Sequence, residues 1–187
     1  MASIQEKISA LIPEATFTEA QVLEIAVPDA QWHKLAKTLY EDAESPFDYL
    51  TTIVGMDWGE TLGCIYYLES TKTGKRLSVR VETADRQNPM LHSVADIWES
   101  ANFYEREVYD FFGIIFINHP DMRRLFLRRD WVGYPLRKDY DASPEVNPIR
   151  LHHEESYDTT TSYIEQPDGK IVKTEKARVF QIVKFKR

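Results

Sequence analysis

The segment between residues 105 and 140 carries the side chains whose types and spacing could do chemistry. It opens on the triplet Glu105-Arg106-Glu107, passes Asp110 and an apolar run, and reaches His119 before two arginine pairs. Seven basic and six acidic residues fall between positions 101 and 140. Carboxylates beside a histidine can act as general acids and bases. Charges this dense also form structural ion-pair networks, because a buried charge without a partner is costly.

We favour the structural interpretation of Glu105, Glu107 and His119 over catalysis by a small independent hydrolase. Ion-pair networks also perturb titration, so unusual carboxylates alone do not indicate an active site. The chain contains neither GxGxxG nor GxxxxGK[ST], and it has no GxSxG nucleophile elbow. We therefore predict no catalytic residue in this chain.

Two histidine-containing stretches could bind a metal, and for both we predict a simpler role. His119-Pro120-Asp121 is typical of a turn with a hydrogen-bonded imidazole. Residues 152–155 read His-His-Glu-Glu, but adjacent residues of an extended segment point in different directions, so a solvated polar stretch is expected. The prediction is that the chain holds no metal.

Helical periodicity predicts that a helix runs from Ser93 into the charged segment. One apolar face then collects Val94, Ile97, Trp98, Ala101, Tyr104, Val108 and Phe112. Glu105 falls in the middle of this face, so it must be protonated, paired with a cation or given backbone donors. We expect it to pair with an arginine, the candidates being Arg123, Arg124, Arg128, Arg129 and Arg137. Arg106 and Asp110 are four residues apart on the opposite side and can pair with each other.

The elements that must position this segment indicate an α+β fold. Apolar spacing predicts helices over 3–12 and from Pro28-Asp29 onward, and a strand over 22–27. Three further strands are expected over 47–56, 61–70 and 76–83, and their short connections predict antiparallel hairpins. We expect helices packed on a mostly antiparallel sheet within a compact domain over 1–140. Residues 141–187 are expected to form an extended C-terminal tail that docks on partner subunits.

The apolar stretch over 178–185 leaves two possibilities for the end of the tail. It could add a strand to a partner protein, or it could return as a last strand to the domain's own sheet.

Composition excludes several classes of function. The single cysteine, Cys64, rules out an intrachain disulfide and an iron–sulfur cluster held by four thiolates of this chain, and we expect a buried inert thiol. A net charge of −7 argues against non-specific nucleic-acid binding, although an arginine-based binding module is a weaker alternative. The apolar run over 111–117 is too short to span a bilayer, and the first ten residues do not resemble a signal peptide. We therefore expect an intracellular protein that could associate peripherally with a membrane complex.

The charged segment resembles the signature of the 30 kDa subunit family, the C subunits of NADH:quinone oxidoreductase (respiratory complex I). Its first part matches at Glu105, Arg106, Glu107, Asp110, Phe111 and Phe112, and its second at His119, Arg123, Leu125 and Phe126. The continuation Asp130-Trp131-x-Gly133-x-Pro135-Leu136-Arg137-Lys138-Asp139 is also similar.

The resemblance implies a non-redox scaffold subunit in the peripheral arm, at the cytoplasmic face of the membrane. The D subunit and neighbouring iron–sulfur subunits would be its partners, and FMN and the clusters would lie in those partners, with no cofactor in this chain. Related complexes fed by ferredoxin, deazaflavin or hydrogenase modules remain an alternative. The resemblance assigns structural or interface roles to Glu105, Arg106, Glu107, Asp110, His119, Arg123, Arg124, Gly133, Pro135 and Arg137.

Overall fold

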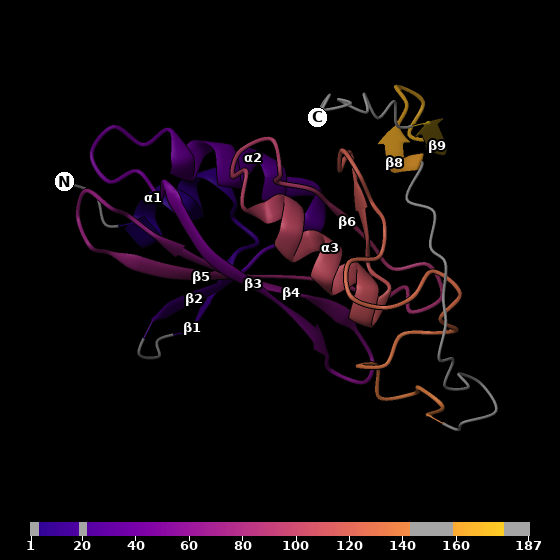
Figure 1. The fold of residues 1–187 in the computed structure, drawn as a ribbon. Helices are drawn as coiled ribbons and strands as arrows, with labels where there is room; N and C mark the ends of the chain where they lie inside the picture. The colour runs from indigo at the N-terminus through magenta and orange to yellow at the C-terminus, as the bar shows by residue number, and fades with distance from the viewer. Residues whose placement is uncertain (1–3, 19–21, 143–158, 178–187) are drawn as a thin grey trace, which may run out of the picture.

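A five-stranded sheet forms the centre of the computed structural model, which describes residues 4–18, 22–142 and 159–177 (Figure 1). The strand order is β1 (Thr16–Thr18), β2 (Leu23–Ala26), β5 (Arg76–Thr83), β4 (Leu62–Glu69) and β3 (Tyr49–Asp57). Only the β2–β5 pairing in this sheet is parallel; the other three are antiparallel. The predicted α+β class with a mostly antiparallel sheet is confirmed.

The hairpins β3–β4 and β4–β5 form as the sequence predicts. Gly59 and Gly74 take positive φ angles of 96° and 68° in the two connections, a conformation that costs glycine little. Alternate residues of β4 then face the helices, so that Tyr66 lies opposite Val79 and Leu68 lies opposite Leu77. All four side chains are buried, and they form the middle of the core.

Helices α2 (Asp29–Tyr40) and α3 (Ala101–Phe112) cover one face of this sheet, and the short helix α1 (Ile4–Leu11) lies near α2 (Figure 1). Trp32 of α2 is fully buried against Tyr66 and Trp98, with ring centroids 4.6 and 6.3 Å away. α3 packs on β3 at Gly55, where an added Cβ would lie 2.6 Å from the Phe112 ring. The close approach of α3 to the sheet therefore depends on a glycine.

The predicted start of the third helix at Ser93 is wrong, because α3 begins at Ala101 and residues 94–100 form turns. Ser93 and Val94 donate hydrogen bonds to the Glu105 side chain instead of starting a continuous helix. α3 ends at Gly113, which has a left-handed φ of 71°. The chain then forms β7 (Ile115–Ile117), which pairs in parallel with β6 (Met90–His92).

Two strands follow after the charged segment. β8 (Thr159–Glu165) and β9 (Ile171–Ala177) form an antiparallel hairpin, and β8 accepts backbone hydrogen bonds from Asn118 and Met122. This part of the predicted extended tail is therefore folded into a hairpin. The rest of that tail, with residues 152–155 and the strand-like stretch over 178–185, lies outside the described residues. The domain boundary at residue 140 stays a prediction.

Among the described residues, no helix is both long and apolar enough to cross a membrane.

Candidate functional site

Glu105 lies in the core, as its place on the apolar face predicts, with 0% of its surface exposed. Its Oε1 accepts the Val94 N–H at 2.8 Å, and its Oε2 accepts the Ser93 hydroxyl at 2.6 Å. The predicted arginine partner is wrong, because neutral donors from the turn before α3 occupy both carboxyl oxygens. Burial disfavours the charged form and raises the Glu105 pKa to about 8.

His119 is the histidine nearest to Glu105, with 4.0 Å between Nε2 and Oε2. Its Nε2 is 3.1 Å from the Asn102 carbonyl oxygen, and its Nδ1 accepts the Asp121 N–H at 2.9 Å. These two bonds assign a neutral imidazole with its proton on Nε2, and burial lowers the His119 pKa to about 4. The predicted turn with a hydrogen-bonded imidazole is confirmed. Both side chains are closed to solvent, so a substrate could not reach this pair.

Asp110 lies on the opposite side of α3 and is held by four donor groups. Arg124 donates from Nη1 at 2.9 Å, and the other donors are the backbone N–H groups of Leu125, Phe126 and Leu127 at 3.0, 2.6 and 2.9 Å. Successive N–H groups that converge on one carboxylate form an anion-binding nest. Asp110 thereby fixes the loop that follows His119.

The pair between Arg106 and Asp110 that their spacing allows does not form. Arg106 donates to the carbonyl oxygens of Arg123 and Arg124 at 3.2 and 3.3 Å, whereas Asp110 pairs with Arg124. This loop covers the polar side of the helix, and Arg106 is only 5% exposed. Helical periodicity did not reveal the loop, because the loop follows the helix in the chain and folds back over it.

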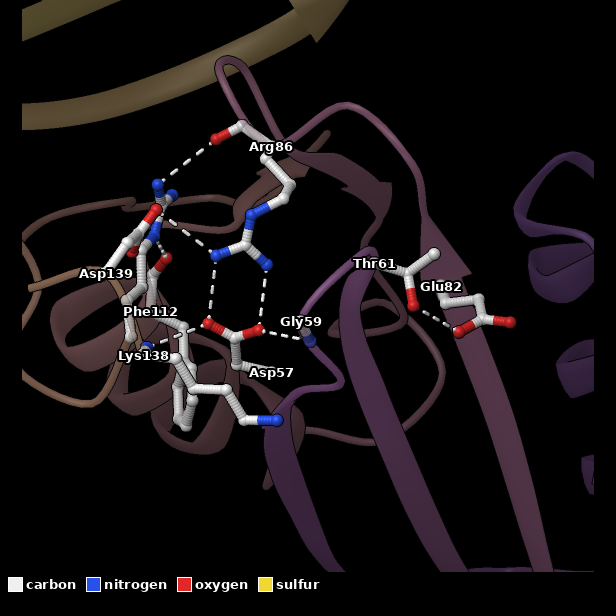
Figure 2. A network of polar contacts seen from close by, with 9 residues as sticks. Asp57, Gly59, Thr61, Glu82, Arg86, Phe112, Lys138 and Asp139 are labelled. Carbon is white, nitrogen blue, oxygen red and sulfur yellow. Dashed lines mark hydrogen bonds and ion pairs between the residues drawn. The ribbon is translucent and has the colours of Figure 1, made fainter.

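The second turn of the charged segment is fixed to the end of β3 by a network that sequence reasoning missed (Figure 2). Arg86 donates to both carboxylate oxygens of Asp57, at 2.8 and 3.0 Å. Asp57 also accepts the N–H groups of Lys138 and Gly59, and the Arg86 pair holds its pKa well below the usual range. The available signal was an aspartate at the end of a strand, two residues before a glycine.

Arg137 and Gly133, two of the predicted interface positions, complete the structure of this turn. Arg137 donates from Nε to the Phe112 carbonyl oxygen at 2.6 Å and from Nη1 to that of Arg86. Gly133 has a φ of 79°, and its carbonyl oxygen accepts from Arg124. Pro135 lies beside them in the turn. The charged segment is thus bound to the C-terminal end of α3, because its Arg137 donates to the carbonyl oxygen of the last helical residue.

Glu107 differs from the other signature carboxylates because it is exposed. It borders a shallow groove of about 220 Å³ between α3 and β3, where Phe111, Phe112 and Leu136 also contribute. Four apolar side chains of the charged segment and of α3 face outward, with exposed fractions of 61% for Phe103, 63% for Phe126 and 56% for both Val132 and Leu136. Apolar side chains presented on a fixed framework are typical of a protein interface.

The described residues contain no group of three or more side chains arranged to hold a metal ion. Cys64 is fully buried, as predicted, and burial raises the pKa of its thiol well above the usual range. The arrangement is therefore suited to holding a segment in one shape and presenting its apolar side chains.

The fold is shared with a chain of a respiratory assembly. The structure of the membrane-bound sulfane sulfur reductase, an archaeal respiratory membrane complex, contains a chain that matches with a TM-score of 0.65 and 25% sequence identity. The match covers 83% of this chain and 95% of that one. Fold and site together define a protein of the kind found in respiratory membrane complexes.

The chain belongs to the family described as "Respiratory-chain NADH dehydrogenase, 30 Kd subunit", whose model matches residues 25–146. The predicted membership of the 30 kDa subunit family of complex I is confirmed.

Individual relatives are named as subunits of NADH-quinone oxidoreductase. The C/D subunit of Phocaeicola vulgatus is 58% identical over 127 residues, which are 67% of this chain and 24% of that protein. The C subunit of Chloroherpeton thalassium is 41% identical over 122 residues, 64% of this chain and 50% of that protein. The C subunit of Chlorobium phaeobacteroides is 38% identical over 124 residues, covering 65% and 74%. The match spans about a quarter of the length of the C/D relatives.

Proposed function

We propose that this chain is a non-redox scaffold subunit in the peripheral arm of a proton-translocating NADH:quinone oxidoreductase. The observation that carries the proposal is the internal use of the signature's charges. The signature carboxyl groups of Glu105 and Asp110 accept hydrogen bonds from neighbouring parts of the same chain, and the signature residue Lys138 donates one to Asp57. In this proposal the hydrogen-bonded charges fix the conformation of the segment, and the exposed apolar side chains of Phe126 and Leu136 contact a neighbouring subunit.

The partners that this proposal implies are the D subunit and the adjacent iron–sulfur subunits. The C/D name of the Phocaeicola vulgatus relative supports a close association between a C-type and a D-type part. In this arrangement the FMN and the clusters lie in partner subunits and this chain holds no cofactor. It binds at the cytoplasmic face of the membrane through the complex and supports electron transfer from NADH to quinone.

The test is assembly in membranes. An affinity-tagged full chain is expressed in its own host, and complexes are recovered from detergent-solubilised membranes. We expect the wild type to recover a large NADH-oxidising complex and the double variant Phe126→Ser/Leu136→Ser to lose it. Tyr49→Ser is the matched control, because Tyr49 is 54% exposed on β3, outside the charged segment. Recovery of the wild-type chain alone, or normal assembly of the double variant, would contradict the proposal.

A second candidate is the equivalent subunit of a related membrane complex with another electron donor, such as ferredoxin, deazaflavin or a hydrogenase module. The structural likeness to a chain of the sulfane sulfur reductase complex favours this alternative. The same recovered complex distinguishes the two. Oxidation of NADH supports the first candidate, and turnover with reduced ferredoxin but not NADH supports the second.

A further inference from the structure

A basic cavity of about 280 Å³ lies where α3, the loop over 122–129 and the β8–β9 hairpin meet. Its walls carry four cationic side chains and two tyrosines: Arg123, Arg124, Arg129, Lys173, Tyr109 and Tyr163. None of the residues that line it bears a carboxylate. The function proposed above makes no use of this cavity.

Two of the three arginines of the cavity are bound to acidic groups that lie outside it. Arg124 is bound to Asp110 and to three carbonyl oxygens, and Arg123 donates to Asp121 at 2.7 Å. These four bonds occupy both Nη groups of Arg124, so its guanidinium supplies positive charge at a fixed position on the cavity wall and does not offer a fork to a ligand. The result is a set of guanidinium groups held at the wall of a cavity that is open to water.

Two phenolic hydroxyls at the cavity are available to a ligand. Within the part of the chain that the structure describes, the hydroxyls of Tyr109 and Tyr163 have no hydrogen-bond partner. Burial raises the Tyr109 pKa to about 12, so this hydroxyl keeps its proton and can donate it in a hydrogen bond. Thr161 adds a third hydroxyl at the wall formed by β8.

We propose that this cavity binds a phosphate group, either as free phosphate or as the headgroup of a phospholipid. Donors converge on it from a helix, a loop and a hairpin, which suits the oxygens of a tetrahedral oxyanion better than those of a planar carboxylate. The positive charge of the arginines attracts an anion, and the Lys173 ammonium and the hydroxyl groups can donate hydrogen bonds to its oxygens. The site is independent of the chain's role as a scaffold subunit.

The test compares charge changes on the two faces of one strand. Lys173 lines the cavity, whereas Lys176 is three residues further along β9 and therefore points to the other face. Inorganic phosphate is titrated into the full chain by calorimetry at constant ionic strength. We expect saturable binding that Lys173→Gln/Tyr163→Phe weakens about tenfold or more, because both lost groups contact the anion. Lys176→Gln should stay within about twofold of the wild type, since an exposed charge on the far face is screened.

A third variant should bind more tightly. Glu175 pairs with Lys173 at 2.5 Å on the same face of β9 and competes with the ligand for this ammonium group. Glu175→Gln is expected to tighten phosphate binding, an effect that a merely structural role for Lys173 would not produce.

Vesicles distinguish the two sources of phosphate. Phosphatidylcholine vesicles with and without phosphatidic acid are sedimented with the full chain and its variants. Binding that needs phosphatidic acid, is lost in Lys173→Gln/Tyr163→Phe and is displaced by inorganic phosphate assigns a lipid headgroup. Binding of inorganic phosphate without vesicle binding assigns free phosphate. The proposal is overturned if neither probe binds, or if Lys176→Gln weakens binding as much as the cavity variant.

Discussion

Glu105 and Asp110 belong to the same helix and are equally inaccessible to water, yet their surroundings differ. Glu105 accepts two hydrogen bonds, from a hydroxyl and one backbone N–H group. Asp110 accepts from three backbone N–H groups and from the Arg124 guanidinium. The two equally buried carboxyl groups thus receive different numbers of hydrogen bonds. For Glu105, burial raises the pKa by more than its two hydrogen bonds lower it, and the pKa is about 8.

The difference assigns separate tasks to the two sides of α3. On the Asp110 side an ion pair and a ring of N–H groups fix the loop that follows His119. On the Glu105 side a carboxyl group fixes the turn that precedes the helix, and its raised pKa favours the neutral form. The type and number of hydrogen-bond donors, and not burial alone, therefore decide which role a buried carboxyl group has in the structure.

The largest effect is expected from Asp110→Asn. The amide removes the charge opposite Arg124 and turns a donor toward N–H groups that need an acceptor. We expect a loss of about 3–5 kcal/mol in the free energy of unfolding, as for a buried ion pair that loses one partner. Chemical denaturation measures it, and Asp130→Asn, in a partly exposed ion pair with Arg128, should cost less than about 1 kcal/mol. Equal losses for both variants would contradict the role of Asp110.

Glu105 variants should separate packing from charge. Glu105→Ala leaves a cavity and an unpaired Val94 N–H group, so we expect a loss of about 2–4 kcal/mol. Glu105→Gln keeps the volume, one acceptor and one donor, and it should cost less than about 1 kcal/mol near neutral pH. A glutamine variant as unstable as the alanine variant in the same denaturation experiment would show that a charged Glu105 is needed.

The raised pKa of Glu105 should make the free energy of unfolding depend on pH. The Glu105 pKa is about 8 in the folded protein and has its ordinary value of 4.5 when the chain unfolds. Between these values the folded state binds one proton more, so the free energy of unfolding falls with rising pH, by at most about 1.4 kcal/mol per unit.

Denaturation of the wild type and of Glu105→Gln at several pH values tests this sign. His119 and His92, with pKa values of about 4 and about 9, titrate in both proteins, so their contributions cancel in the difference. We expect the wild type to lose stability relative to the variant as pH rises toward about 8. Parallel curves would show that Glu105 does not bind this proton.

The smallest effect on folding is expected from Glu107→Gln, which changes an exposed carboxylate on the same helix. The free energy of unfolding should change by less than about 0.5 kcal/mol, because the side chain is solvated. Recovery of the assembled complex is the second measurement. A large loss of stability in the purified chain would mean that Glu107 belongs with the buried carboxyl groups.

Local patterns predicted the fold where neighbours in sequence are also neighbours in space. The hairpins from β3 to β5 were predicted from alternation and short glycine turns, and α1 and α2 from apolar spacing. The three-residue strands β1, β6 and β7 were missed, because so short a segment has too little periodicity to detect. The start of α3 was misplaced because the apolar spacing of residues 94–98 also suits buried turns.

The sequence predicted the burial of Glu105 but not the partners of the charged side chains. Burial of Glu105 followed from its position on an apolar face, and the resemblance identified the signature itself. The expected arginine partner of Glu105 was wrong because backbone N–H groups can take the place of a cation beside a carboxylate, and backbone carbonyl oxygens can take the place of a carboxylate beside an arginine. Which backbone groups are available cannot be read from the sequence. The link between Asp57 and Lys138 joins residues 81 positions apart, and no local pattern reveals such a contact.

That distant link has a kinetic consequence. Closing a loop between residues 81 positions apart costs chain entropy, so we expect the bond between Asp57 and Lys138 to form late and to contribute little to the folding transition state. We expect Arg86→Gln, which removes the guanidinium from Asp57, to accelerate unfolding much more than it slows refolding. Stopped-flow measurement of both rates tests this, and a mainly slower refolding would contradict it. The network in Figure 2 would then slow unfolding and so set the lifetime of the folded state.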